Sequence, residues 1–334
     1  MVSKHDTQLR VGVEIAESAT HLTATTEPNV SGLRWQARLA APPTPEIATA
    51  EIASLIARVA HEIVATHSEI EPNVAAVGIA VGGQVNAEQG IVLALPQAVS
   101  WTDFPLVRRL TERLSVPIQI DSATNAACLA EFHIGAGKAA AHMLYVHVGR
   151  GIASAYIEHG QLLHGAQGAA GALGHLLVCM DGPRCSCGAH GHLEPIASAQ
   201  SVVRRMIGQA ADHDSSHATM LQMTGGRAEA ITVAQIVELS ESGEPVARAV
   251  VNDALDALSL ALAHAVTLLA PDIIVVGGPF AIIGEPFLIP LRARVQTLCQ
   301  PFTRMPELVG ATLEPRAAQI GAYLLAEAIT TPLG

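Results

Sequence analysis

The stretch GALGHLLVCMDGPRCSCGAHGHLEPIAS, residues 171–198, concentrates metal-binding side chains in a short window. Three of the chain's five cysteines and three histidines fall within it, among glycines and prolines. Thiolate and neutral imidazole are the ligands that tetrahedral zinc prefers, and a Cys-x-Cys pair has the close spacing of a ligand turn. The preferred ligand set is His175, Cys185, Cys187 and His192, with His190 and Cys179 as alternatives for the fourth position.

Two other interpretations of this window are a glycine-rich surface loop with idle thiols and a disulfide. Cys185 and Cys187 are separated by a single residue, and a bridge at that spacing is strained. A metal is therefore the preferred interpretation. Four protein donors leave no coordination position for water, so the predicted zinc is structural rather than catalytic.

Length and composition favour a soluble protein with more than one core. A chain of 334 residues is long enough for two lobes. Its start is polar, with no apolar segment of a secretory signal, and the longest apolar stretch, Leu255 to Ala270, is interrupted by Ser259 and His264. We expect a cytoplasmic protein without a membrane partner. The formal net charge of −11 argues against direct nucleic-acid binding.

Hydrophobic periodicity predicts the same order of elements in the two halves of the chain. In the first half we expect two strands over Leu9–Ala24, a helix over Ile47–Ser68, strands over Val74–Val81 and Val116–Ile120, and a helix over Thr124–Phe132. In the second half we expect strands over Met143–Val148 and Ile152–Ile157, a helix from Ala199 to Met206, a mobile insertion over Ser215–Arg227, helices over Ile231–Ser240 and Pro245–Leu269, a strand over Pro271–Gly278 and a helix over Ala317–Ile329. This repeat suggests two related α/β lobes that face a cleft.

The sequence resembles the ROK proteins, a family of repressors, open reading frames and sugar kinases. Where the family reads roughly GExGHxxV…CxCGxxGCLExxxS, the window 171–198 reads GALGHLLV…CSCGAHGHLEPIAS, without the glutamate and with a histidine for the third cysteine. Weaker matches occur in the expected order elsewhere in the chain. The resemblance implies a two-lobed α/β fold of the actin-like ATPase (ribonuclease H-like) type, with an interlobe cleft and a zinc loop. It predicts a small lobe over residues 9–121, to which helix 317–334 returns, and a large lobe over 122–316. It also implies a homodimer and a small-molecule ligand such as a sugar or sugar derivative.

For the site, the resemblance implies that zinc supports a sugar pocket and that His192 replaces the family's third cysteine. His175, Glu194 and Gly83 are then the substrate-binding residues. A helix-start carboxylate, favoured by the helix dipole, is the alternative role for Glu194.

The catalytic base of the family kinases is missing from this chain. Where kinases read Glu-Asn-Asp-Ala-Asn, residues 121–125 read Asp-Ser-Ala-Thr-Asn, which places Ala123 at the base position. Asp121 is the candidate substitute, but its displacement by two residues takes it out of productive geometry. We therefore expect no intact catalytic residue.

The nucleotide loops are also altered. The first, residues 14–18, has lost both of its glycines; the second and third keep Gly149 and Gly151, and Gly277 and Gly278. We predict a ROK-type protein that is inactive as a sugar kinase and acts as a ligand-binding or regulatory protein.

Two alternatives remain. One is an ATP-dependent kinase of a hexose or amino sugar with a rearranged active site, for which ATP and Mg²⁺ would be cofactors. The other is a DNA-binding repressor, but the first predicted strand begins at Leu9, and the repressors of the family carry a winged helix before it.

Overall fold

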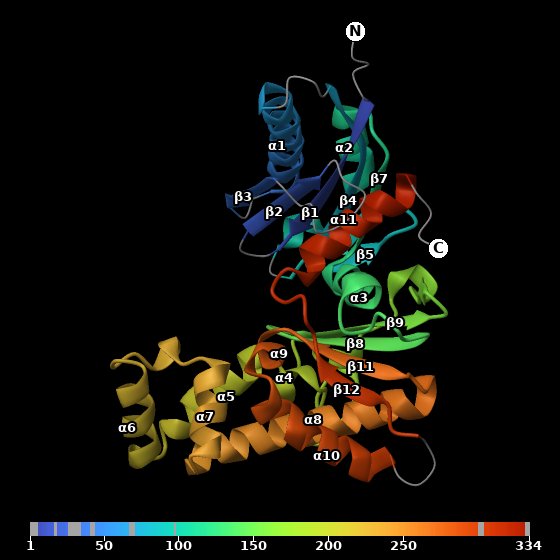
Figure 1. Ribbon diagram of the computed structural model, residues 1–334. Coiled ribbons are helices and arrows are strands. Elements are labelled where there is room, and N and C mark those ends of the chain that lie inside the picture. The colour runs from blue at the N-terminus through green and yellow to red at the C-terminus, as the bar shows by residue number, and fades with distance from the viewer. Residues whose placement is uncertain are drawn as a thin grey trace. The chain divides into compact units, whose positions relative to one another are not determined.

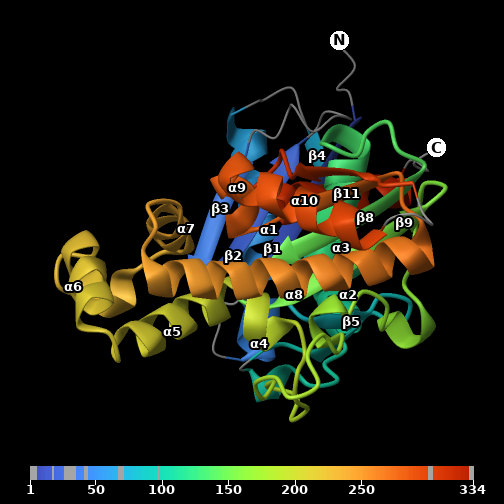
Figure 2. The same cartoon turned by 90° about the horizontal axis from the view of Figure 1, so that it is seen from below.

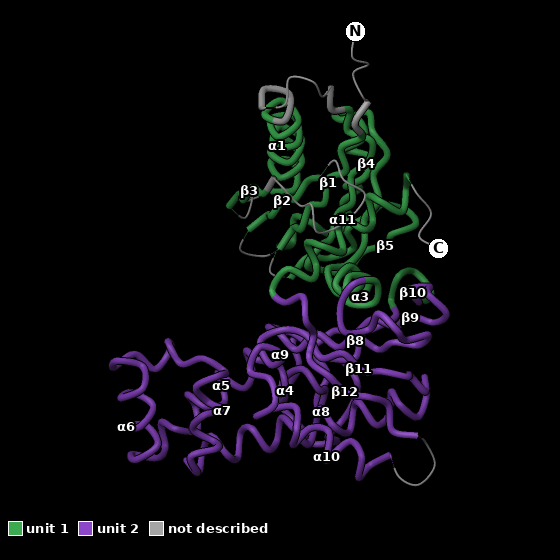
Figure 3. Tube along the Cα trace, viewed as in Figure 1, with its two compact units in different colours: residues 1–133, 164–169, 315–334 green, residues 134–163, 170–314 purple. Residues whose placement is uncertain are grey.

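The computed structural model describes residues 6–16, 19–25, 35–40, 44–66, 71–96, 98–299 and 304–330. The chain forms two compact units, shown in Figure 3. The first comprises residues 1–133, 164–169 and 315–334, and the second comprises residues 134–163 and 170–314. Helix α3 (Ala123–Ile134) thus belongs mainly to the first unit, on the other side of the predicted boundary at residue 121.

The first unit contains a five-stranded mixed sheet in the order β3-β2-β1-β4-β7. Strands β1, β2 and β3 are antiparallel neighbours, whereas β4 and β7 run parallel to β1. Both faces of the central strands are covered, which explains their nearly continuous apolar runs. The strand bounds are β1 (Asp6–Ile15), β2 (Ala19–Thr25), β3 (Trp35–Ala40), β4 (Glu71–Val81) and β7 (Ile118–Ser122).

The C-terminal helix α11 (Ala317–Thr330) packs directly on β1 and β4 (Figure 1). Glycines permit this close approach: a Cβ atom at Gly78 would overlap the carbonyl oxygen of Ala322, and one at Gly12 would lie 2.5 Å from the backbone nitrogen of Tyr323. The unit is completed by α1 (Pro45–Thr66), α2 (Leu106–Leu114) and the hairpin of β5 (Gln84–Asn86) and β6 (Ile91–Ala94).

The second unit contains a sheet of the same design, in the order β10-β9-β8-β11-β12. Again three antiparallel strands are followed by two that run parallel to the first strand of the unit. The α/β architecture with two related sheets, predicted from the repeated element order, is therefore confirmed. The bounds are β8 (His142–Val148), β9 (Ile152–Glu158), β10 (Gln161–Leu162), β11 (Ile273–Gly277) and β12 (Glu307–Gly310).

Helix α8 (Pro245–Leu269) is the central helix of the second unit, as Figure 2 shows. It is long and apolar enough to span a membrane by length and composition, but 61% of its apolar window is buried inside the protein, as expected of a core helix. Four helices pack on α8, namely α4 (Glu194–Ala197), α5 (Ala199–Ala210), α7 (Val233–Glu241) and α10 (Glu285–Cys299); α9 (Pro279–Ile283) follows β11.

The segment predicted as a mobile insertion is instead largely helical. Residues Asp214–Met223 form helix α6. Met220 is 1% exposed in the core of the unit, and the Ser216 hydroxyl donates a hydrogen bond to Glu244, the N-cap residue of α8. The polar composition of the segment concealed these two anchoring contacts.

Candidate functional site

The window 171–198 lies in the second unit and folds into irregular loops that backbone hydrogen bonds hold together. The amide of Leu193 donates to the carbonyl of Leu176 at 3.0 Å, and the amide of Cys185 donates to Ala189 at 2.8 Å. Gly191 has a φ of +74°, and a Cβ there would overlap the carbonyl of Cys179. Gly191 is therefore required by the close packing of the backbone in this window.

The structure brings the four preferred donors together. One ligand atom from each of His175, Cys185, Cys187 and His192 lies within 4.8 Å of the others. The distance from Cys185 Sγ to His175 Nδ1 is 3.6 Å, and that from Cys187 Sγ to His192 Nδ1 is 3.4 Å. Ligand bonds of about 2.3 Å to sulfur and 2.0–2.1 Å to nitrogen predict a separation of about 3.5 Å across a tetrahedral zinc. The chemistry of the four donors and these two sulfur–nitrogen distances therefore fit zinc.

The two alternative donors lie outside this cluster. His190 places its Nδ1 3.4 Å from the carbonyl oxygen of Gly182, and Cys179 is exposed. Cys185 is 3% exposed, and its burial is the largest influence that raises the pKa of the thiol. A metal ion would favour the thiolate instead.

Glu194, a predicted substrate-binding residue, contacts the second glycine loop. Its Oε2 accepts a hydrogen bond from the amide of Ile152 at 3.1 Å. A Cβ at Gly151 would lie 2.5 Å from the same oxygen, so this glycine makes room for the carboxylate. The turn at Gly149 is closed by its own amide, which donates to the carbonyl of Gly151 at 2.9 Å.

Glu314, which the sequence did not single out, occupies the third glycine loop. Gly278 has a φ of +83°, and its amide donates to Glu314 Oε1 at 2.8 Å. The Tyr145 hydroxyl donates to the same oxygen at 3.0 Å, and His147 Nδ1 lies 3.7 Å from it. Burial is the largest influence on the pKa of Glu314 and raises it, but the hydrogen bonds and the nearby imidazole together lower it. We infer that Glu314 is ionised and that its carboxylate accepts the hydrogen bond from the amide of Gly278.

Asp121 lies in the first unit, at the carboxyl end of β7 and just before Ala123, the first residue of α3. It is 2% exposed. Oδ1 accepts hydrogen bonds from the amide of Ser122 and from Asn125 Nδ2, both at 2.7 Å, and Oδ2 lies 2.7 Å from His164 Nε2. His164 is 43 positions away in the sequence, so local patterns gave no signal that it belongs here.

Backbone packing explains why position 83 is a glycine, without any contact to a ligand. It follows β4, and a Cβ at this position would overlap the carbonyl oxygen of Ala94. In the first predicted nucleotide loop, residues 14–18, Glu17 and Ser18 lie outside the described residues.

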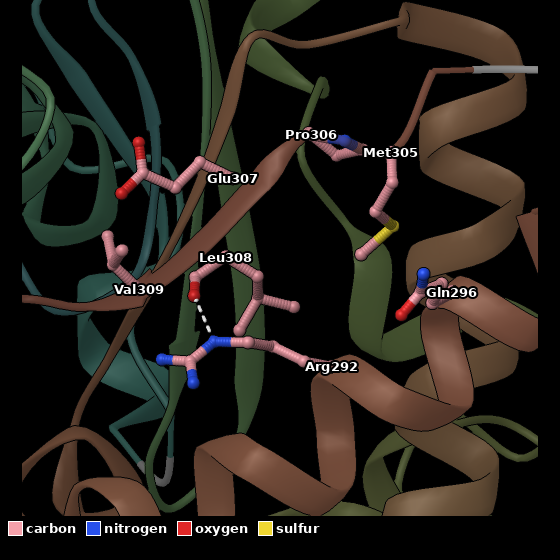
Figure 4. Close-up of a pocket in the computed structure, with 7 residues that line it drawn as sticks. All are labelled: Arg292, Gln296, Met305, Pro306, Glu307, Leu308 and Val309. Carbon is pink, nitrogen blue, oxygen red and sulfur yellow. Dashed lines mark hydrogen bonds between the residues drawn. The ribbon is translucent and has the colours of Figure 1, made fainter.

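A shallow pocket of about 300 Å³ lies between α10 and β12 and contains none of the predicted site residues. In Figure 4, Arg292 Nε donates to the carbonyl of Leu308, at 2.7 Å. The guanidinium also pairs with both carboxylate oxygens of Glu285, at 2.8 and 2.9 Å. Because the cation of this pocket is already paired, we do not assign a function to it.

Comparison with known proteins places nearly the whole chain in one family. A model of the ROK family matches residues 11–329. A glucokinase of Thermotoga maritima is 30% identical over 247 residues, which cover 74% of this chain and 77% of that protein. A xylose repressor of Caldicellulosiruptor bescii is 28% identical over 219 residues, which cover 65% of this chain and 53% of the repressor.

A solved structure matches over nearly the full length of both chains. It is a ROK family glucokinase from Streptomyces griseus in complex with glucose and AMPPNP, with a TM-score of 0.77, 28% identity, and coverage of 95% of this chain and 99% of that chain. The fold is thus the two-sheet α/β fold of the ROK sugar kinases. Since the family match takes in both sheets and the Cys/His window, this chain belongs to the ROK family.

Proposed function

We propose that this ROK protein binds a small hydroxylated ligand, such as a sugar or sugar derivative, and acts in regulation rather than as a sugar kinase. The observation that carries the proposal is at the base position. Ala123 has no titratable group, and the adjacent carboxylate, Asp121, already accepts two N–H groups while its other oxygen faces His164. Each hydrogen bond to a charged group is worth roughly 1.5–3 kcal/mol. Turning Asp121 towards a substrate would break several of them at once.

The nucleotide side supports the same conclusion. Two backbone amides that a phosphate or a nucleotide would use already donate hydrogen bonds to carboxylates. The amide of Ile152 donates to Glu194, and the amide of Gly278 donates to Glu314. At a separation of 4 Å, two like charges near a protein surface repel by about 4 kcal/mol. We therefore expect the polyanion Mg·ATP to bind this unit poorly.

A structural zinc is part of the proposal. The ion would be held by His175, Cys185, Cys187 and His192. Its role would be to fix the loop that precedes Glu194, the first residue of α4. Two thiolates and two neutral imidazoles balance the charge of Zn²⁺, so this donor set needs no further counter-ion. His175 would then serve the ligand site through the loop it anchors.

We also propose that the two compact units are the two functional lobes expected from the sequence, with most of α3 and residues 164–169 added to the first. In addition, we propose that the protein forms a homodimer and does not bind nucleic acid directly. The net charge of −11 supports the last point. The match to the xylose repressor spans about half of that protein. We propose that this chain would take part in repression only through a partner protein.

A rearranged hexose or amino-sugar kinase is the second candidate. The near full-length similarity to a glucokinase structure with glucose and AMPPNP favours it. Calorimetry separates the two functions. We expect heat on titration with a sugar and none with millimolar Mg·ATP, whether or not the sugar is present. Saturable heat with Mg·ATP would contradict the proposal.

A further inference from the structure

We propose that His164, held in place by Asp121, is the residue of the first unit that contacts a hydroxyl group of the ligand. This inference rests on the proposed function, because it takes ligand binding to be the task of the site. His164 matches none of the family positions identified in the sequence. It is instead assigned by three features of the structure.

The first feature is the pairing itself. Asp121 is 2% exposed, and its Oδ2 lies 2.7 Å from Nε2 of His164, whose side chain is 40% exposed. A carboxylate only accepts hydrogen bonds, so Nε2 carries a proton towards Asp121, and in the neutral ring Nδ1 is then the acceptor nitrogen. The buried partner thus selects one tautomer, as in other carboxylate–histidine pairs that orient a functional imidazole.

The second feature is the position of the pair. Asp121 is the penultimate residue of β7, which runs parallel to β4, and α3 begins two residues after it. Ligands of open α/β sheets bind at the carboxyl ends of parallel strands. The imidazole therefore lies at this end of β7, where it contacts Asp121, two residues before Ala123.

The third feature is the local backbone around His164. Residues 164–169 join the first unit although the segments on either side belong to the second. Within this short excursion Gln167 adopts a φ of +58°, and a Cβ at Gly168 would overlap the carbonyl oxygen of Val85. A left-handed conformation is strained for a non-glycine residue, and such strain is typically retained at functional sites.

The test uses the full chain with ¹⁵N-labelled histidine and, as probes, D-glucose, D-xylose and N-acetyl-D-glucosamine. His164→Gln identifies the resonances of His164. His61→Gln, an exposed histidine on α1 of the same unit, is the matched control. We expect at least one sugar to shift the His164 ring resonances. We also expect His164→Gln to weaken the Kd for that sugar roughly tenfold, the loss of about one hydrogen bond, and His61→Gln to leave it unchanged.

Asp121→Asn tests the positioning role of the carboxylate separately. The side-chain amide nitrogen of the new asparagine would donate to Nε2, so we expect the ring proton of His164 to move to Nδ1. The ¹⁵N shift of Nδ1 should then become that of a protonated nitrogen, and that of Nε2 the shift of an unprotonated one. A sugar that binds without moving the His164 resonances, or a panel in which no sugar moves them, would overturn the inference. Phosphate transfer by the wild-type protein would instead refute the proposed function and leave the assignment of His164 standing.

Discussion

Replacing Asp121 by alanine tests the claim that this carboxylate is an anchored structural group and not a spare base. The side chain is 2% exposed and takes part in three contacts of 2.7 Å. At roughly 1.5–3 kcal/mol each, three hydrogen bonds to a charged group give an upper bound of about 5–9 kcal/mol. His164 is 40% exposed and regains water, so its share is largely offset. We therefore expect Asp121→Ala to lower the free energy of unfolding by about 3–5 kcal/mol.

The assay can report on the first unit alone. Both tryptophans of the chain, Trp35 and Trp101, belong to this unit, and Trp101 is 1% exposed. Urea unfolding followed by tryptophan fluorescence therefore measures the stability of the unit that contains Asp121. Glu51→Ala, an exposed carboxylate on α1, is the matched control, with an expected change within about 0.5 kcal/mol. Equal effects of the two substitutions would refute the reasoning.

Three further predictions follow from the site and the core. Cys185→Ser should lower thermal stability and reduce the bound zinc, measured by metal analysis, from one ion per chain to well below one. The control His190→Ala should change neither quantity. An unchanged zinc content in Cys185→Ser would contradict the proposed ligand set. Burial raises the pKa of Tyr323 from 10.0 to about 12, so the unfolded state loses this proton first and stability should fall as pH rises from 10 to 12. Urea unfolding should show a smaller fall in Tyr323→Phe, and equal falls would contradict the assignment. Ala123→Asp alone should not produce phosphate transfer in a coupled ATPase assay, because the amide of Gly278 stays occupied; measurable turnover would show that the nucleotide side is competent.

The parts of the fold that the sequence predicted are those governed by local periodicity and by the repeat. The apolar runs at β1, β4, β8 and β11 and the long amphipathic α8 could be placed from hydrophobic spacing alone. The prediction for α6 was wrong because its polar surface hides the single buried Met220 and the contact of Ser216 with Glu244. Tertiary contacts, not propensity, determine that segment.

Some residues of the candidate site could likewise be predicted from local sequence patterns, and others could not. The metal donors fall within 18 residues of one another, from His175 to His192, so spacing alone indicated them. His164 and Glu314 were missed because their partners are distant: Asp121 lies 43 positions from the histidine, and Gly278 lies 36 positions from the glutamate. Only the folded sheets bring these groups together, and a single sequence carries no signal of such pairs.

Phosphate transfer tests the central claim most directly. Wild-type protein is incubated with Mg·ATP and a panel of hexoses and amino sugars, and ADP release is followed. The account predicts no sugar-dependent turnover above background, because Ala123 stands at the position that we propose for the base and Glu314 accepts the hydrogen bond from the amide of Gly278. Turnover of about 1 s⁻¹ or more on any of these sugars, a rate typical of kinases, would contradict it.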